Sequence, residues 1–112
     1  MGDLTADVER RNYPRVRIHI DAQLTAPGCT LRGHTLDLSA GGAFVQTHRP
    51  IPIGTGVRLA LGRGAARNPL VLDAEVVRVG DPREGRLSGV GLRFLGLTAL
   101  ETGLLQAMLA AA

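Results

Sequence analysis

Two clusters of polar residues have types and a spacing that could bind an anionic ligand. The first is Arg10-Arg11-Asn12-Tyr13-Pro14-Arg15, in which three residues separate Arg11 from Arg15 and Arg10 adds a third guanidinium. Pro14 disfavours a helical conformation for the residue before it, so we expect this segment to be extended or bent. Three guanidiniums on a short arm repel one another unless an anion joins them. Because arginine pairs bidentately with phosphate and with the O6/N7 edge of guanine, the cluster suits a phosphate group or that base.

The second cluster follows about 20 residues later and reads Asp37-Leu38-Ser39-Ala40-Gly41-Gly42. A carboxylate accepts two hydrogen bonds, which matches the N1 and N2 donors of guanine. Ser39 adds a hydroxyl, and the two-residue period of a strand places it on the same face as Asp37. Gly41 and Gly42 accept a positive φ without a Cβ clash, so we expect them to form a turn that a ligand can approach closely.

Each cluster also has a purely structural interpretation. The arginine segment could be the end of a solvated basic tail that Asp7 and Glu9 partly neutralise. All 13 basic residues are arginine, which the codon bias of a GC-rich genome would also produce. Asp37 and Ser39 could cap the backbone amides of a hairpin turn. Taken alone, each cluster favours its structural interpretation.

Enzymatic constellations are weak. His19, His34 and His48 are too far apart in sequence for a local metal-binding motif, so we expect no metal site. Strand alternation places His34 on the face opposite Asp37 and Ser39, which argues against a nucleophilic triad. The sequence has no GxSxG elbow and no P-loop. We therefore expect no catalytic residues and no enzymatic activity.

Short strands must position these clusters. Val16, Ile18 and Ile20 alternate with polar residues, which predicts a half-buried strand from Pro14 through Leu24. Five more strands are expected at residues 31–38, 43–47, 57–61, 70–79 and 88–94, separated by Gly- and Pro-rich turns. This spacing lacks βαβ units and predicts an antiparallel sandwich or small barrel.

The pattern changes to a helical period near the C-terminus. Thr98-Ala99-Leu100-Glu101 has the form of a capping box, with a Thr N-cap and a Glu three residues later. Apolar residues then recur at helical spacing, at Leu100, Leu104, Leu105, Met108 and Leu109. We expect a short helix that packs this face on the barrel, or less simply on a partner.

Composition limits the class of protein. A chain of 112 residues, 45% of them hydrophobic, is enough for one domain with a modest core. It has no apolar run that could span a bilayer, no signal peptide and a single cysteine, Cys29, which together fit a cytoplasmic protein. The formal charge is +3. We expect a flexible tail at residues 1–8 and one domain at residues 9–112.

The two clusters in this order and at this spacing, within an all-β domain, resemble the PilZ domain family. Residues 50–57 resemble the loop and strand that follow the second motif of that family. Gly89-Val90-Gly91-Leu92-Arg93-Phe94 resembles its closing strand, and the short terminal helix also fits. The resemblance extends over roughly residues 9–109. We expect no output or enzyme domain to be attached.

The resemblance implies a six-stranded antiparallel β-barrel with a short C-terminal α-helix that binds cyclic di-GMP. Arg11 and Arg15 would hold phosphates and guanine edges, while Asp37 and Ser39 would bind the guanine and the phosphodiester side. Arg10 precedes the first motif arginine, a position that would favour an intercalated pair of ligands. The implied site comprises Arg10, Arg11, Arg15, Asp37, Ser39, Gly41 and Gly42, with Gly91 and Arg93 as secondary members.

The function implied is that of a bacterial second-messenger receptor whose arginine arm becomes ordered on the ligand and signals to an unidentified effector protein. We expect no cofactor, no DNA or RNA partner and no membrane insertion. A single-strand nucleic-acid binder usually stacks bases on exposed aromatic rings, whereas two of the three aromatic residues, Phe44 and Phe94, fall at expected core positions. The alternative is a PilZ-like protein-interaction module that no longer binds nucleotide.

Overall fold

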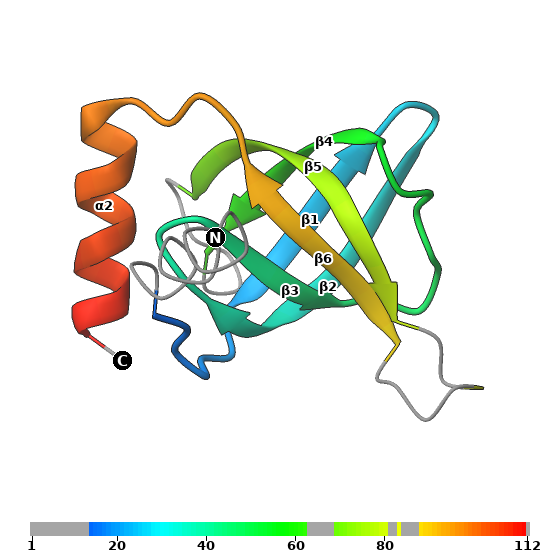
Figure 1. The fold of residues 1–112 in the computed structure, drawn as a ribbon, viewed down its shortest axis with the longest axis horizontal. Helices are drawn as coiled ribbons and strands as arrows, with labels where there is room; N and C mark the ends of the chain where they lie inside the picture. Colours follow the sequence, from blue (N-terminus) through cyan, green and yellow to red (C-terminus); the bar gives the residue numbers. More distant parts are fainter. Residues whose placement is uncertain (1–13, 63–68, 81–82, 84–87, 112) are drawn as a thin grey trace, which may run out of the picture.

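The described part of the chain forms a closed β-barrel followed by one helix. The structure, a computed structural model, describes residues 14–62, 69–80, 83 and 88–111. Its strands are β1 (Asp21–Ala26), β2 (Cys29–Leu38), β3 (Gly42–Gln46), β4 (Gly56–Leu61), β5 (Leu70–Gly80) and β6 (Gly89–Phe94), and its helix is α2 (Ala99–Ala110). Figure 1 shows the strands wrapping around one core, in the order β1-β2-β3-β6-β5-β4, and every neighbouring pair is antiparallel. The fold expected from the sequence, a six-stranded antiparallel barrel with a terminal helix, is confirmed.

Aliphatic side chains fill the barrel, as the scarcity of aromatic residues requires. Alternate positions of β1 are buried, and the same period-two pattern continues in β4, where Val57, Leu59 and Leu61 point inward. The largest fully buried side chains of the strands are Leu24, Leu38, Leu59, Leu61, Leu72, Val45, Val76 and Val90. Closure leaves no free sheet edge in the barrel, so each strand pairs on both sides.

The first predicted strand begins later than the alternation indicated. Residues 14–20 run beside β2, but their ladder is reduced to one bridge, between Val16 and Leu38. The side chain of Thr35 takes the place of the ladder: its hydroxyl accepts from the Ile20 N–H at 2.9 Å and donates to the Ile18 carbonyl. Thr35 is fully buried. The segment before β1 is therefore tied to β2 by the Thr35 hydroxyl, by the Val16–Leu38 bridge and by the Thr35 N–H, which donates to the Ile20 carbonyl at 2.9 Å, and regular pairing starts only at Asp21.

A β-bulge interrupts β2 just before the second cluster. The register between β2 and β3 shifts between Thr35 and Asp37, so Leu36 is an extra residue. Strict alternation from the inward-facing Thr35 would direct Asp37 into the core. The bulge instead turns Asp37 to the outer surface, and Leu38 resumes the inward pattern at 0% exposure. The prediction that His34 and Asp37 lie on opposite faces is therefore wrong, because it assumed an uninterrupted strand.

A second bulge lies in β5. The register with β6 shifts between Val76 and Arg78, and Val77 is the extra residue. Val76 is fully buried whereas Val77 and Arg78 are both exposed. Without the bulge, Arg78 would follow Val76 into the core with a charged guanidinium. Its consequence is an arginine on the outer face, two strands away from β3.

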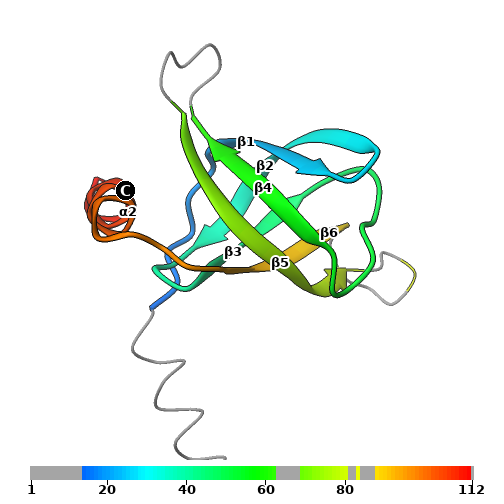
Figure 2. The same cartoon turned by 90° about the horizontal axis from the view of Figure 1, so that it is seen from above.

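The helix begins as the sequence predicted. Thr98 is its N-cap, its hydroxyl accepts from the Glu101 N–H at 3.1 Å, and the Glu101 carboxylate accepts from the Thr98 N–H at 2.9 Å. Figures 1 and 2 both place α2 at the end of the barrel where the turn between β2 and β3 lies. Leu105 is the buried residue of the helix, and Met108 and Leu109 pack beside it.

The apolar face predicted for the helix is wider than the surface that packs on the barrel. Its five residues span about half of the helix circumference, since successive residues turn by about 100°. The barrel covers the side that carries Leu105, whereas Leu100 and Leu104 remain 73% and 47% exposed. The expectation that the whole face packs on the barrel is therefore only partly correct.

Candidate functional site

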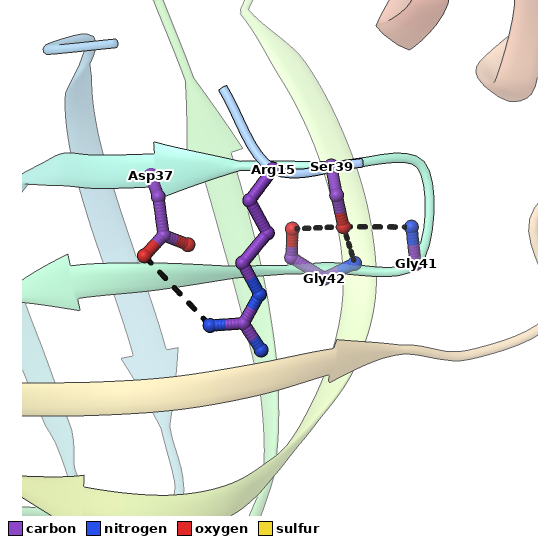
Figure 3. A network of polar contacts seen from close by, with 5 residues as sticks. All are labelled: Arg15, Asp37, Ser39, Gly41 and Gly42. Atoms are coloured by element: carbon purple, nitrogen blue, oxygen red, sulfur yellow. Dashed lines mark hydrogen bonds and ion pairs between the residues drawn. The ribbon is translucent and has the colours of Figure 1, made fainter. Parts of the chain in front are cut away.

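The described members of the two clusters meet on the outer surface at one end of the barrel. The bridge between Val16 and Leu38 brings the residue before it, Arg15, to the turn between β2 and β3. Figure 3 shows the side chains of Arg15, Asp37 and Ser39 together beside that turn, with Gly41 and Gly42 closing it. Arg10 and Arg11, the other arginines of the first cluster, lie outside the described residues. The chain therefore folds so that two segments far apart in sequence share one surface.

Arg15 and Asp37 form a long, exposed ion pair. The Nη1 atom of Arg15 lies 3.9 Å from Oδ2 of Asp37, and the two side chains are 62% and 26% exposed. A pair of this kind contributes about 0–1 kcal/mol to stability because water screens it and both side chains lose rotamer freedom. Both groups can thus exchange their partner for a ligand at little cost.

Ser39 is saturated by its own turn. Its hydroxyl accepts from the N–H groups of Gly41 and Gly42, both at 3.2 Å, and lies 3.3 Å from the Gly42 carbonyl, to which it can donate (Figure 3). A hydroxyl has one donor and two acceptor lone pairs, so these contacts use all of them. Ser39 is also only 6% exposed. In this structure the residue has the capping role that the sequence left open, and a ligand contact would require it to give up one of these bonds.

Gly42 is required by packing and not by a positive φ. Among the described residues, the glycines with positive φ are Gly28, Gly54, Gly89 and Gly96, so the expectation for Gly41 and Gly42 is wrong in this respect. A Cβ atom on Gly42 would lie 2.1 Å from the Leu92 carbonyl oxygen of the neighbouring strand. The turn is tight because β3 and β6 approach each other there.

Arg93 of β6 lies beside the turn but already has a partner. It is the register partner of Gly42 on one side and of Glu75 on the other. Its Nη2 atom donates to the Glu75 Oε1 at 2.6 Å, and the two side chains are 62% and 32% exposed. Glu75 therefore holds the guanidinium toward β5 and reduces the positive charge that an anion would meet.

A groove crosses the outer face of the barrel from the segment before β1 to the end of β5. We call it the outer groove; its lining residues are Arg17, His19, Leu36, Asp37, Phe44, Arg78, Val79 and Gly80. Both bulges open onto it, because the one in β2 presents Leu36 and Asp37 and the one in β5 presents Arg78. Bulges commonly re-aim side chains at functional sites. The outer groove thus carries a carboxylate, two guanidiniums and an imidazole on one concave surface.

Phe44 is a floor residue of the outer groove and not a core residue. In β3 the small Ala43 and Val45 point inward, which leaves Phe44 half-buried on the outer side. The Arg78 guanidinium carbon lies 5.7 Å from the centre of the Phe44 ring, within the range of a cation–π contact. The prediction that Phe44 belongs to the core is wrong, because the hydrophobicity of a residue does not by itself say whether its side chain points to the inner or the outer face of the barrel.

Gly91 gives Arg78 its space. Gly91 is the register partner of Phe44 in β3 and of Arg78 in β5, so it lies between them. A Cβ atom on Gly91 would lie 3.1 Å from the Arg78 Cβ and 3.2 Å from its Nε. The residue that the sequence associated with the ligand is buried, and what it touches is the Arg78 side chain.

Asp37 is the one lining residue of the outer groove that was a sequence candidate, and the charged and aromatic residues that were missed are Arg17, His19, Phe44 and Arg78. The first two follow Arg15 in alternating positions, which is a signal that could have been used. His19 also faces His34, with ring centres 5.3 Å apart. Arg78 gave no local signal, because only the bulge in β5 brings it outward.

In residues 14–62, 69–80, 83 and 88–111, no three His, Cys, Asp or Glu side chains gather where they could hold a metal ion. In the same part of the chain, no helix is long and apolar enough to cross a membrane.

Comparison with known proteins identifies a family and a shared fold. The family model described as PilZ domain matches residues 9–111. The PilZ domain of YcgR from Escherichia coli, solved with c-di-GMP, superposes with a TM-score of 0.68 at 24% identity, and the match covers 91% of this chain and 90% of that one. The PilZ domain of CeSA from a cellulose synthesizing bacterium gives a TM-score of 0.66 at 18% identity, over 88% of this chain and 96% of that one.

A longer protein shares the same fold in part. The Bacillus subtilis inhibitor of motility, MotI/DgrA, gives a TM-score of 0.71 at 21% identity; the match covers 91% of this chain but 50% of that one. This chain therefore spans about half the length of that relative. A search of curated protein sequences found no match.

Proposed function

This chain belongs to the PilZ domain family, and we propose that it is a receptor for cyclic di-GMP that signals to a protein partner. The family match covers nearly all of the chain. The similar PilZ domain of YcgR was solved with c-di-GMP. The proposal takes residues 9–112 as the receptor domain and residues 1–8 as its tail. It assigns the chain ligand binding and no catalytic step.

The observation that carries the proposal is the placement of Arg15 next to Asp37 on the outer surface of the barrel (Figure 3). Cyclic di-GMP presents two phosphodiesters and two guanines. The guanidinium can pair with a phosphodiester, while the carboxylate can accept from N1 and N2 of a guanine. The ligand would replace one weak ion pair with two charge-assisted interactions. This exchange favours binding because the existing pair is long and exposed.

The remaining arginines of the first cluster belong to the proposal by their place in the sequence. Arg10 and Arg11 precede Arg15 by a few residues, so their guanidiniums are within chain reach of a phosphate held at Arg15. We propose that they close over the ligand, that the arm becomes ordered when the phosphates neutralise it, and that Arg10 supports binding of an intercalated pair. Ordering of a charged segment by an anion is an established form of molecular switch.

Isothermal titration with cyclic di-GMP tests the proposal. We expect binding, with Arg11→Ala and Arg15→Ala each weakening the affinity by roughly 10- to 100-fold, because each removes a charge-assisted hydrogen bond. Arg58→Ala is the matched control, since Arg58 is an exposed strand arginine on β4, 73% exposed, and pairs with Asp73 on the opposite side of the barrel. The titration also gives the number of nucleotides bound. No binding at tens of micromolar protein would refute the proposal.

The role of Asp37 is tested by comparing ligands. Adenine lacks the N1–H and N2 donors of guanine, so cyclic di-AMP would leave the Asp37 carboxylate without partners in the site. We expect the wild-type protein to prefer cyclic di-GMP, and Asp37→Ala to reduce that preference. An Asp37→Ala variant with unchanged affinity and unchanged preference would remove Asp37 from the site.

A second candidate function is a PilZ-like protein-interaction module without nucleotide binding. The exposed leucines of α2, Leu100 and Leu104, favour a surface for another protein. The same titration separates the two candidates, because an interaction module would show no heat of binding with cyclic di-GMP. Binding of cyclic di-GMP would exclude this second candidate, although the exposed helix surface could then contact the effector of the receptor.

A further inference from the structure

We propose that Arg78 is a ligand-contacting residue that stacks on one base of the bound nucleotide, at a subsite outside both sequence motifs. The inference rests on the proposed function and adds to it a residue, a contact and a position. Arg78 and Asp37 line the same outer groove. A guanine in this groove would present its edge to the Asp37 carboxylate and its face to the Arg78 guanidinium.

A β-bulge in β5 places Arg78 in the outer groove. Val77 is the extra residue of the bulge in β5, and it turns Arg78 from the core side to the outer side. The bulge in β2 does the same for Asp37. Two separate irregularities, on strands that are not neighbours, thus direct a cation and a carboxylate into one groove. Regular strands would have buried both side chains.

The Arg78 side chain is supported on two sides. The Phe44 ring lies under its guanidinium, with the guanidinium carbon 5.7 Å from the ring centre. Gly91 lies beneath its stem, where a Cβ atom would come within 3.1 Å of the Arg78 Cβ. Arg78 itself is exposed. The guanidinium therefore has the Phe44 ring on one side, within cation–π range, while its other side can take a base, because a guanidinium stacks on π-systems as well as donating hydrogen bonds.

No competing acid holds Arg78 in the part of the chain that the structure describes. The ion pairs there join Arg15 to Asp37, Arg58 to Asp73 and Arg93 to Glu75. Arg93, which sequence reasoning linked to the ligand, is thus held by Glu75 at 2.6 Å, whereas Arg78 rests on Phe44. Of these two arginines, Arg78 is the better placed to stack on a base.

Titration of cyclic di-GMP into Arg78 variants tests the inference. We expect Arg78→Ala to weaken binding about 5- to 100-fold, the loss typical for removal of a base-stacking side chain. Arg78→Lys keeps the charge but loses the planar group, so we expect it to recover less than half of the lost binding free energy. Arg58→Ala, which removes the same charge from β4 outside the outer groove, should change affinity by less than 2-fold. Full recovery in Arg78→Lys would refute stacking.

A double-mutant cycle with Gly91 shows whether position matters. We expect Gly91→Ala to weaken binding, because the added methyl lies 3.1 Å from the Arg78 Cβ and 3.2 Å from its Nε and must push that side chain aside. In the Arg78→Ala background the Cβ atom of residue 78 remains but the side chain beyond it is gone, so the same change should cost clearly less affinity. Equal losses in both backgrounds would refute a role of Gly91 through Arg78.

The outcomes separate the inference from the proposed function. If the wild-type protein binds cyclic di-GMP and Arg15→Ala weakens binding while Arg78→Ala does not, the Arg78 subsite is refuted and the receptor function stands. If the wild-type protein does not bind, both are refuted. If both variants weaken binding and Arg58→Ala does not, both are supported.

Discussion

Removal of one buried hydroxyl should loosen the segment that carries the first cluster. Thr35 holds residues 14–20 against β2, since its hydroxyl accepts from the Ile20 N–H and donates to the Ile18 carbonyl. Thr35→Val keeps the shape of the side chain and removes only the hydroxyl. The two backbone groups then lose their partner in a position where β2 offers no replacement. We predict a loss of both stability and ligand affinity.

The size of the effect follows from burial. Ile20 is 7% exposed, so water reaches its N–H poorly and most of the desolvation penalty of that group is felt. Ile18 is only partly buried, so its carbonyl can regain a water. A buried, unpaired backbone donor costs about 1–3 kcal/mol. We expect a decrease of about 2 kcal/mol in the free energy of unfolding, which is roughly 30-fold in the equilibrium constant.

Urea unfolding and hydrogen exchange measure this prediction. The midpoint should fall by roughly 1 M with an unchanged m-value, because the native and unfolded surfaces stay the same. The Ile20 amide should exchange much faster in Thr35→Val. Thr35→Ser is the control: it loses a buried methyl, worth about 1 kcal/mol, but keeps the hydroxyl. It should therefore retain the protection of the Ile20 amide.

A Thr35→Val variant that is within 0.5 kcal/mol of the wild type and whose Ile20 amide stays protected would refute this role of the hydroxyl. That result would mean that the backbone bonds of this segment to β2, at Val16–Leu38 and from the Thr35 N–H to the Ile20 carbonyl, hold it without the hydroxyl. A stability loss without any change in cyclic di-GMP affinity would refute only the functional part, namely that Arg15 needs a fixed backbone to bind the ligand.

Three further changes test other parts of the structure. Ser39→Ala should destabilise the domain by about 1–2 kcal/mol in urea unfolding, because two turn amides lose their acceptor; no change would mean that the turn is held by its backbone bonds alone. Glu75→Gln should release Arg93 and raise cyclic di-GMP affinity about 2- to 5-fold at low ionic strength, with the gain shrinking in salt; a salt-independent or absent gain would place Arg93 outside the site. Leu105→Ala should cost about 2–5 kcal/mol, because Leu105 is 0% exposed, and a cost below 1 kcal/mol would mean that α2 is not anchored by this residue.

Local sequence patterns specified most of the strands, the helix and the two polar clusters of the site. The alternation of Val57, Leu59 and Leu61 defines β4 because a strand has a period of two that requires no knowledge of its neighbours. The capping box at Thr98 and Glu101 specified the start of α2 because both partners lie within four residues. The order and spacing of the two polar clusters also pointed to the PilZ family, whose model matches residues 9–111.

The sequence did not reveal where the alternation breaks. Leu36 in β2 and Val77 in β5 are ordinary strand residues, yet each is the extra residue of a bulge. One sign was available in β2, since Leu31 and Leu38 are both apolar but stand at positions of opposite parity. Whether a strand resolves such a conflict with a bulge depends on how it pairs with its neighbours.

Sequence by itself therefore determined the β class, the helix and the identity of the two polar clusters, because these depend on residues close together along the chain. Tertiary structure alone decided that Asp37 and Arg78 share one groove, that Phe44 lies outside the core and that Gly91 makes room for Arg78. These facts arise from the register of β2, β3, β5 and β6 around a closed barrel. A shift of one residue in that register turns a side chain from the core to the surface, and only the pairing of distant strands sets it.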